Sequence, residues 1–220
     1  MVGLYAQFLN RKYHSRLDPD ADQCIGNIVQ GVLRMRTLLQ DVLAYSQAGA
    51  SLEGSPSVAD FEAALQVVLL RLKRPIETAG AVISHGKLPF VAAHRKHVEM
   101  ILKKLFENSL EYRAASPLQI CVGYEPAGGY GRFYVRDNGI GIEPQYFLRI
   151  FQIFKRLHSY ASHPGSGVGL AICEKIVKRY GGEIWVESEA GKGATFWFTL
   201  PLATEAPLRQ VSDDRVMSAG

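Results

Sequence analysis

The sequence predicts an α+β protein in which a helical hairpin precedes a domain of mixed helices and strands. Three observations support this prediction. An apolar seam with helical spacing runs through residues 19–47, a linker rich in Gly, Ser and Pro covers 49–57, and helical and strand-like patterns are mixed over 58–203. The final residues, 204–220, show no periodicity and are expected to form a loose tail.

A helical hairpin is expected within residues 1–48. Asp18 suits an N-cap, Pro19 suits the first helical position, and two aspartates favour the positive end of the helix. Apolar residues then follow a 3-4-3-4-3 spacing: Ile25, Ile28, Val32, Met35, Leu39 and Val42. Other apolar residues widen this stripe, so we expect two copies of the hairpin to form a four-helix bundle in a homodimer. The alternative is a helix that lies on the core of its own domain.

The domain of residues 58–203 shows a sequence of helical and strand patterns separated by turn residues. In order they are a helix over 60–80, a strand over 81–86, a helix ending near 113, strands over 119–126 and 131–137, a helix over 169–182, and a hairpin of strands over 183–189 and 194–202.

Composition excludes several classes of protein. Hydrophobic residues make up 47% of the chain and charged residues 21%, as in soluble globular proteins. No apolar run approaches the roughly 20 residues of a membrane span, and no signal-peptide pattern opens the chain. Three scattered cysteines favour a reducing compartment, so a cytoplasmic protein without membrane attachment is expected. The net charge of +4 lacks the clustering that a nucleic-acid surface needs.

The helix before residue 113 carries a polar residue in its apolar stripe. The stripe runs through Ile101, Leu105, Asn108 and Tyr112, so Asn108 stands where Leu or Ile is expected. An unpaired buried amide costs about 1–3 kcal/mol, and Asn108 should therefore have a partner.

Two glycine clusters are candidates for ligand binding. "RDNGIGI" (136–142) follows a strand, and Asp137 there could accept a hydrogen bond from an amino group such as that of adenine, although Asp-Asn-Gly is also ordinary turn chemistry. "PGSGVGL" (164–170) opens a helix, where backbone N–H groups favour an anion such as phosphate. It lacks the Gly-Lys-Ser/Thr of a P-loop. A dinucleotide fingerprint has G-x-G-x-x-G after a strand and an acidic residue about twenty residues further on. Glu187 could be that acidic residue, but the G-x-G-x-G spacing and the absence of a preceding strand argue against this motif.

The ordered motifs resemble those of a known family. Asn108 on its helix, "DNGIGI", "FQIFKRLH" (151–158), "GSGVGL" and "GKGATF" (191–196) are similar to the motifs of the ATP-binding catalytic region of bacterial two-component sensor histidine kinases, above all the phytochrome-like group. "DVLAYSQ" (41–47) similarly resembles the second helix of their dimerisation hairpin. The resemblance implies a two-layer α/β sandwich, a mixed sheet covered by helices, as in the gyrase and Hsp90 ATPases.

The resemblance also implies an ATP site with Mg²⁺. Asn108 would bind Mg²⁺, Asp137 would read the adenine amino group with Thr195 nearby, and Tyr112 would lie against the base. Residues 143–164 would form a mobile lid, anchored by Phe151 and Phe154, for which a purely core role is also open. The ATP-binding residues implied are Asn108, Tyr112, Arg113, Asp137, Gly139, Gly141, Ile142, Phe151, Arg156, Gly165, Gly167, Val168, Gly169, Leu170 and Thr195.

The chain departs from the family pattern at the phospho-acceptor. The family's acceptor histidine lies in the middle of the first hairpin helix. We expect that half of the helix to be missing from this sequence, by truncation or by divergence, and an upstream sensor domain is absent from it as well. His14 has Pro19 five residues later but stands next to the turn, so we expect a surface residue there rather than the acceptor.

Lys104 and Glu111 also depart from the pattern. Lys104 stands where the family has Asn or a general-base Glu, and a protonated lysine neither abstracts a proton nor binds Mg²⁺. Glu111 replaces a basic residue that helps to hold phosphate. One hypothesis is a charge exchange, in which Lys104 supplies the cation that position 111 lost. The other is that both reach solvent, with Lys104 pairing with Glu107 or Asn108.

Two functions are therefore expected from the resemblance. The first is a histidine kinase region that transfers the ATP γ-phosphoryl group to a histidine and works with a response regulator receiver domain. The alternative is a nucleotide-binding dimeric scaffold with impaired catalysis, favoured by Lys104, Glu111 and the missing acceptor.

Overall fold

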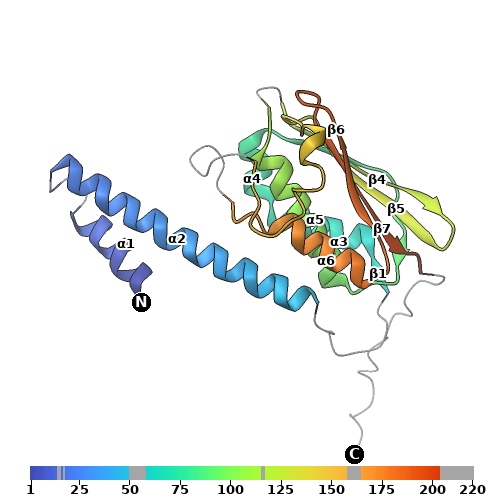
Figure 1. The fold of residues 1–220 in the computed structure, drawn as a ribbon, viewed down its shortest axis with the longest axis horizontal. Helices are drawn as coiled ribbons and strands as arrows, with labels where there is room; N and C mark the ends of the chain where they lie inside the picture. The colour runs from blue at the N-terminus through green and yellow to red at the C-terminus, as the bar shows by residue number, and fades with distance from the viewer. Residues whose placement is uncertain (14–15, 17, 50–57, 115–116, 158–164, 204–220) are drawn as a thin grey trace, which may run out of the picture.

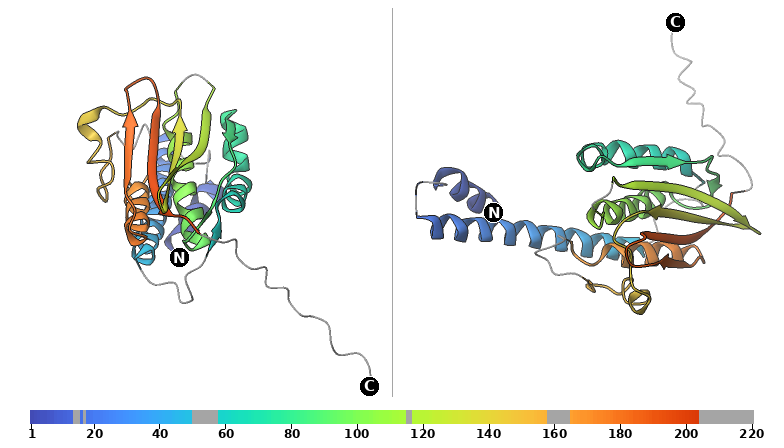
Figure 2. Two further views of the ribbon diagram at one scale, coloured as in Figure 1. Left: turned by 90° about the vertical axis from the view of Figure 1, so that its right-hand side faces the viewer. Right: turned by 90° about the horizontal axis from the view of Figure 1, so that it is seen from above.

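The computed structural model describes residues 1–13, 16, 18–49, 58–114, 117–157 and 165–203. It begins with the predicted helical hairpin, α1 (Val2–Tyr13) and α2 (Pro19–Ala48). Asp18 caps α2 by accepting a hydrogen bond from the Ala21 N–H at 2.7 Å, as expected. The shorter α1 packs beside the first half of α2. This half of α2 extends away from the α/β domain (Figures 1 and 2). His14, the linker from residue 50 to 57 and the tail lie outside the described residues.

The apolar seam of the hairpin is largely exposed in the single chain. In α2, the side chains of Ile28, Met35 and Leu39 are 52%, 55% and 66% exposed. The last two turns of α2 behave differently, because Ala48 is fully buried and Tyr45 packs against the domain core. The alternative of a helix lying on its own domain therefore applies only to the C-terminal end of α2.

The predicted helix over 60–80 is in fact two helices, α3 (Phe61–Arg71) and α4 (Lys73–Ala79). Pro75 explains the break. Its ring would clash with the carbonyl of Arg71 in a continuous helix, and it has no N–H to donate there. In the first turn of a new helix that N–H is not needed, so α4 starts after Leu72.

Among the described residues, five strands form the main sheet in the order β2-β4-β5-β7-β6. The pair β2–β4 is parallel and the other neighbours are antiparallel, so the sheet is mixed as expected. The strands are β2 (Val82–His85), β4 (Gln119–Ala127), β5 (Tyr130–Asp137), β6 (Ile184–Ser188) and β7 (Ala194–Pro201). A separate short pair, β1 (Ala59–Asp60) with β3 (Phe90–Val91), was not predicted.

Helices α3, α5 (Arg95–Glu111) and α6 (Gly169–Arg179) pack on one face of the sheet, giving the predicted two-layer sandwich (Figures 1 and 2). The ring of Phe133 on β5 stacks on Phe61 of α3 at a centroid distance of 4.3 Å and on Phe198 of β7 at 5.5 Å. The α5 stripe contributes Ile101 and Leu105, both fully buried. This packing fixes the C-terminal end of α5 beside the end of β5. A short 3-10 turn, η1 (Pro144–Tyr146), follows β5.

A histidine at the start of α5 makes folding stability sensitive to acid. The Tyr180 hydroxyl accepts the His94 backbone N–H at 2.9 Å and lies 2.7 Å from His97 Nδ1. The hydroxyl proton is therefore best placed to donate to an unprotonated Nδ1. Burial, together with Arg179 and His94, lowers the pKa of His97 from 6.5 to about 4.

We expect acidification to destabilise the fold through His97. Between pH 6.5 and about 4, His97 is protonated in the unfolded chain but not in the folded one. The free energy of unfolding therefore falls as the pH falls through this window. From pH 7 to pH 5 the loss from this residue is about 2 kcal/mol. Urea unfolding of the wild type and of His97→Gln, which still accepts from Tyr180, tests this. The variant should lose less stability over that range, and parallel pH profiles would contradict the assignment.

Candidate functional site

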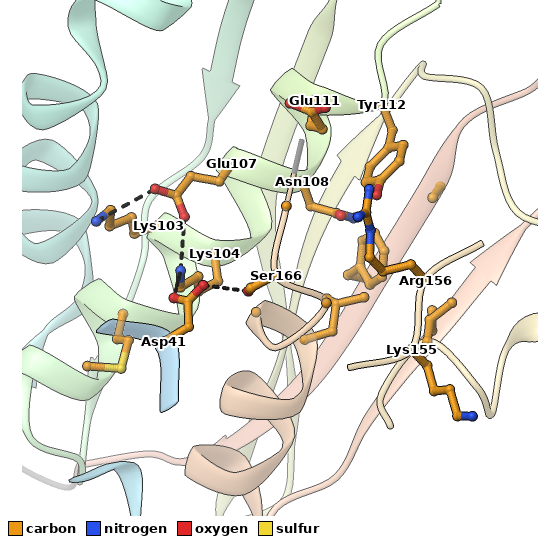
Figure 3. A pocket seen from close by; sticks show the side chains of 18 of the residues that line it. Asp41, Lys103, Lys104, Glu107, Asn108, Glu111, Tyr112, Lys155, Arg156 and Ser166 are labelled. Atoms are coloured by element: carbon orange, nitrogen blue, oxygen red, sulfur yellow. Dashed lines mark hydrogen bonds and ion pairs between the residues drawn. The ribbon is translucent and has the colours of Figure 1, made fainter. Parts of the chain in front are cut away.

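Helix α5 lies along a cavity of about 890 Å³. Other walls include the segment after β5, the glycine segment before α6, residues of β7 and residues of α2 (Figure 3). A volume of this size lies within the range of small-molecule sites. The predicted site residues that line it are Asn108, Tyr112, Asp137, Gly141, Ile142, Arg156, Gly165, Gly167, Gly169 and Leu170.

Asn108 is half-buried and its side chain projects towards Arg156 in the cavity (Figure 3). Its amide makes no hydrogen bond to another residue of the described part of the chain, although the backbone carbonyl accepts the Tyr112 N–H. An amide oxygen that is available in a cavity is a suitable ligand for Mg²⁺, which takes hard oxygen donors. Among the described residues, no group of three or more His, Cys, Asp or Glu side chains could hold a metal alone. A metal here would therefore need oxygens from a second molecule, as Mg²⁺ obtains from phosphates.

Tyr112, one turn after Asn108, is held by Arg156. The two side chains are hydrogen-bonded. Burial and the Glu111 carboxylate raise the pKa of the Tyr112 phenol, against the opposing effect of the Arg156 guanidinium. The phenol is therefore neutral at physiological pH, and its ring forms an uncharged wall of the cavity.

Asp137 ends β5 and is buried at the base of the cavity. Its Oδ1 accepts the Gly139 N–H at 2.9 Å and the Ala194 N–H at 3.3 Å, and its Oδ2 accepts the Ser109 hydroxyl at 2.8 Å. Because a carboxylate oxygen has two lone pairs, Oδ2 can accept one further donor. Ser109 was missed by sequence reasoning, since a serine within a helix gives no signal of its own.

The loop after β5 is fastened to the β6–β7 turn. The Gly191 N–H donates to the Ile140 carbonyl at 2.7 Å and the Ile142 N–H donates to the Ser188 hydroxyl at 2.8 Å. Gly141 has a φ of +72°, and a Cβ there would lie 2.1 Å from the Glu189 carbonyl oxygen. Only glycine permits both this conformation and this approach. The glycine of "DNGIGI" therefore shapes the wall of the cavity.

Five of the predicted ATP-binding residues do not line the cavity, and neither does Phe154, the other predicted lid anchor. Val168 and Phe151 belong to the core, which is the role left open for Phe151, whereas Phe154 is 54% exposed. Gly139 acts through its backbone bond to Asp137. Arg113 is exposed and donates to the Leu110 carbonyl, and the Thr195 hydroxyl accepts Arg136 Nε at 3.3 Å. Part of the predicted lid, 158–164, lies outside the described residues.

Lys104 has a partner that neither sequence hypothesis predicted. Its ammonium group donates to Asp41 Oδ1 of α2 at 2.8 Å and lies 3.3 Å from Glu107 Oε2 (Figure 3). The Lys104 side chain is only 17% exposed, so the expectation that it reaches solvent is wrong, although its pairing with Glu107 is confirmed. Its protons are engaged by these carboxylates, so the structure does not show it as the free cation of a charge exchange. Glu111 lines the cavity.

Comparison with known proteins identifies the family. Residues 93–204 match the family model of the histidine kinase-, DNA gyrase B-, and HSP90-like ATPases, which is about half of the chain. The chain belongs to this ATPase family. The matched segment of this chain contains α5, the "DNGIGI" loop, the glycine segment and β7, so it includes most of the cavity walls described above.

Similar proteins narrow the family to histidine kinases. Cyanobacterial phytochrome A of Nostoc sp. (strain PCC 7120) is 42% identical over 91% of this chain, which corresponds to 26% of that protein. The full-length crystal structure of ShkA in complex with AMPPNP has a TM-score of 0.69 at 28% identity, over 94% of this chain and 44% of that chain. The histidine kinase ThkA, in complex with the response regulator protein TrrA, shares the fold with a TM-score of 0.65 at 20% identity, over 92% of this chain and 57% of that chain. The methanogenesis regulatory histidine kinase FilI of Methanothrix harundinacea is 35% identical over 85% of this chain, which corresponds to 21% of that protein. Together with the family match, this relative shows that the chain contains the ATP-binding catalytic domain of a histidine kinase. The chain spans about a quarter of the length of its curated phytochrome relatives.

No helix among the described residues is long and apolar enough to cross a membrane.

Proposed function

We propose that this chain is the ATP-binding and dimerisation region of a sensor histidine kinase, which transfers the γ-phosphoryl group of ATP to a histidine. The observation that carries the proposal is the cavity, which is lined by the available amide of Asn108, by the glycine segment and by the buried carboxylate of Asp137. In this proposal Asp137 accepts the adenine amino group, Tyr112 lies against the base, and backbone N–H groups at Gly165 to Gly169 receive the phosphates.

Magnesium would be held by the Asn108 amide oxygen together with phosphate oxygens, and it would neutralise charge on the transferred group. The histidine nitrogen attacks the γ-phosphorus, and the bond to the β–γ bridging oxygen breaks as ADP leaves. The protein contributes by positioning and charge stabilisation, because none of these residues is required to form a covalent bond.

We expect Asn108→Ala to abolish the dependence of nucleotide binding on Mg²⁺. Without the amide oxygen the ion loses its protein ligand, so Mg·AMPPNP should bind about as weakly as AMPPNP with EDTA. Calorimetric titration with and without Mg²⁺ measures this. Asn108→Asp is the matched variant, since it keeps an oxygen ligand and should keep the dependence on Mg²⁺. An alanine variant with unchanged Mg²⁺ dependence would remove Asn108 from the metal site.

The dimer is proposed from the exposed seam of the hairpin. The apolar side chains of α1 and α2 exposed in the single chain include Leu4, Phe8, Ile28, Met35, Leu39 and Leu43. An exposed apolar face of this kind is typical of a protein–protein interface, and a second hairpin would bury it in a four-helix bundle. A response regulator receiver domain is the proposed protein partner, by analogy with the ThkA complex.

A specific observation favours the second candidate, a nucleotide-binding scaffold that transfers no phosphoryl group. Lys104 occupies the position of a family Asn or Glu, and its ammonium group is engaged by the carboxylates of Asp41 and Glu107. The deciding experiment is to incubate the chain with γ-labelled ATP and a separate hairpin that carries the acceptor histidine of a phytochrome-like relative. Acid-labile label on the histidine supports the kinase. Tight AMPPNP binding without label supports the scaffold.

A further inference from the structure

Asp41 of α2 joins the dimerisation hairpin to the ATP-binding domain through both of its carboxylate oxygens. Oδ1 accepts the Lys104 ammonium of α5 at 2.8 Å, and Oδ2 accepts the hydroxyl of Ser166 (Figure 3). The residue is only 8% exposed and lines the cavity. We refer to Asp41, Lys104 and Ser166 as the Asp41 latch.

The latch sits at the anion-binding end of the cavity. Ser166 lies between Gly165 and Gly167 in "GSGVGL", and its hydroxyl oxygen accepts the Val168 N–H at 3.2 Å just before α6 begins. Backbone N–H groups and the positive helix end favour a negative group here. In this structure the carboxylate of Asp41 reaches this segment through the Ser166 hydroxyl, so the chain itself supplies a negative group here.

Lys104 remains a cation within the latch. Burial alone would lower its pKa, but the carboxylates of Glu107 and Asp41 outweigh burial and raise it. A buried ammonium that loses one anion is strongly destabilised unless another takes its place. A phosphate at the glycine segment would be such a replacement, because it offers oxygens to the same ammonium and the same hydroxyl.

The end of α2 is also held by polar contacts outside the cavity. Lys175 of α6 donates to the Tyr45 carbonyl at 2.8 Å and lies over the Tyr45 ring at 4.1 Å, and Arg179 donates to the Gly49 carbonyl at 2.9 Å. These contacts use no residue that lines the cavity. The latch is therefore the hydrogen-bonded part of this interface that lines the cavity, where a nucleotide would meet it directly.

We propose that Asp41 competes with the nucleotide phosphates for Lys104 and Ser166, so that ATP binding loosens α2 from the ATP-binding domain. This inference rests on the proposed function and adds a regulation of the same site. The coupling is reciprocal, since docking of α2 that weakens ATP binding by some factor is itself weakened by ATP by that factor. The docking of the hairpin and the binding of the nucleotide would thus weaken each other through the carboxylate of Asp41.

The test is calorimetric titration of Mg·AMPPNP into the full chain at low ionic strength. Asp41→Asn keeps the shape of the side chain but removes its charge, which frees Lys104 for phosphate, and affinity should rise about tenfold. Asp20→Asn is the matched control, because it makes the same charge change at an exposed site on the same helix, and its affinity should equal that of the wild type. Adding Lys104→Met to Asp41→Asn should abolish the gain.

Hydrogen exchange on the wild-type chain supplies an independent reading. Amides of α2 residues 37–46 should exchange faster when Mg·AMPPNP is bound. Equal affinity of the wild type and Asp41→Asn, or exchange in α2 that is unchanged or slower with nucleotide, would overturn the latch and leave the proposed function standing. Absence of AMPPNP binding in the wild type and in every variant would overturn the proposed function and the latch with it.

Discussion

Asp137→Asn is expected to lower ATP affinity about a hundredfold while leaving the fold intact. The asparagine can keep its Oδ1 facing the Gly139 and Ala194 N–H groups, and its amide nitrogen can donate to Ser109, whose hydroxyl then accepts. The cavity-facing edge changes from an acceptor to a donor. That donor would oppose the adenine amino group, and both would lose a partner.

A comparison of two nucleotides and a control variant, both measured by calorimetry, make the Asp137 test specific, and urea unfolding checks that the fold is intact. The preference for ATP over a purine nucleotide with a carbonyl at the amino position should shrink in Asp137→Asn, because the new donor fits the carbonyl. Asp60→Asn is the control. Asp60 caps α3 through the Ala63 N–H, outside the cavity, so this variant should bind ATP as the wild type does. Unchanged ATP affinity in Asp137→Asn would mean that the base does not bind at the end of β5.

Phe61→Ala is expected to destabilise the fold by about 3–5 kcal/mol. The ring is fully buried and lies between α3 and the sheet, against Phe133 at 4.3 Å and Phe198 at 6.3 Å. Since domains of this kind have about 5–15 kcal/mol of stability in total, the variant loses a large share. Chemical denaturation measures the loss.

Phe154→Ala is the matched control for the core prediction. It removes the same ring from a side chain that is 54% exposed, so the free energy of unfolding should change by less than about 1 kcal/mol. If both variants unfolded with the same small change, the Phe61–Phe133–Phe198 stack would not be the centre of the core.

Much of this structure follows from local sequence patterns. The 3.6-residue stripe of α5 and the alternating strands around "DNGIGI" predicted the elements, because side-chain period reflects which face is buried. The same stripe marked Asn108, the polar residue at an apolar position. The split between α3 and α4 was missed although Pro75 signals it, whereas β1 and β3 are two residues each and too short to show any period.

The contacts that tune the site could not be predicted in this way. Asp41 lies 63 residues before Lys104 and 125 before Ser166, and no local rule relates residues so distant. Thr195 shows how a shift of one residue along a strand changes the face to which a side chain points. Ala194 and Phe196 line the cavity, but alternation along β7 turns Thr195 towards Arg136 on the other side of the sheet. Ser109 supplies the hydroxyl beside Asp137 instead.

The measurement that tests the central claim most directly is calorimetric titration of the wild-type chain with Mg·ATP. The site built from Asn108, Asp137 and the glycine segment predicts saturable binding of one nucleotide per chain. It also predicts a rise in thermal stability with ATP concentration, about 2.7 kcal/mol at 100 times the Kd. No heat of binding and no thermal shift at millimolar ATP would contradict the account.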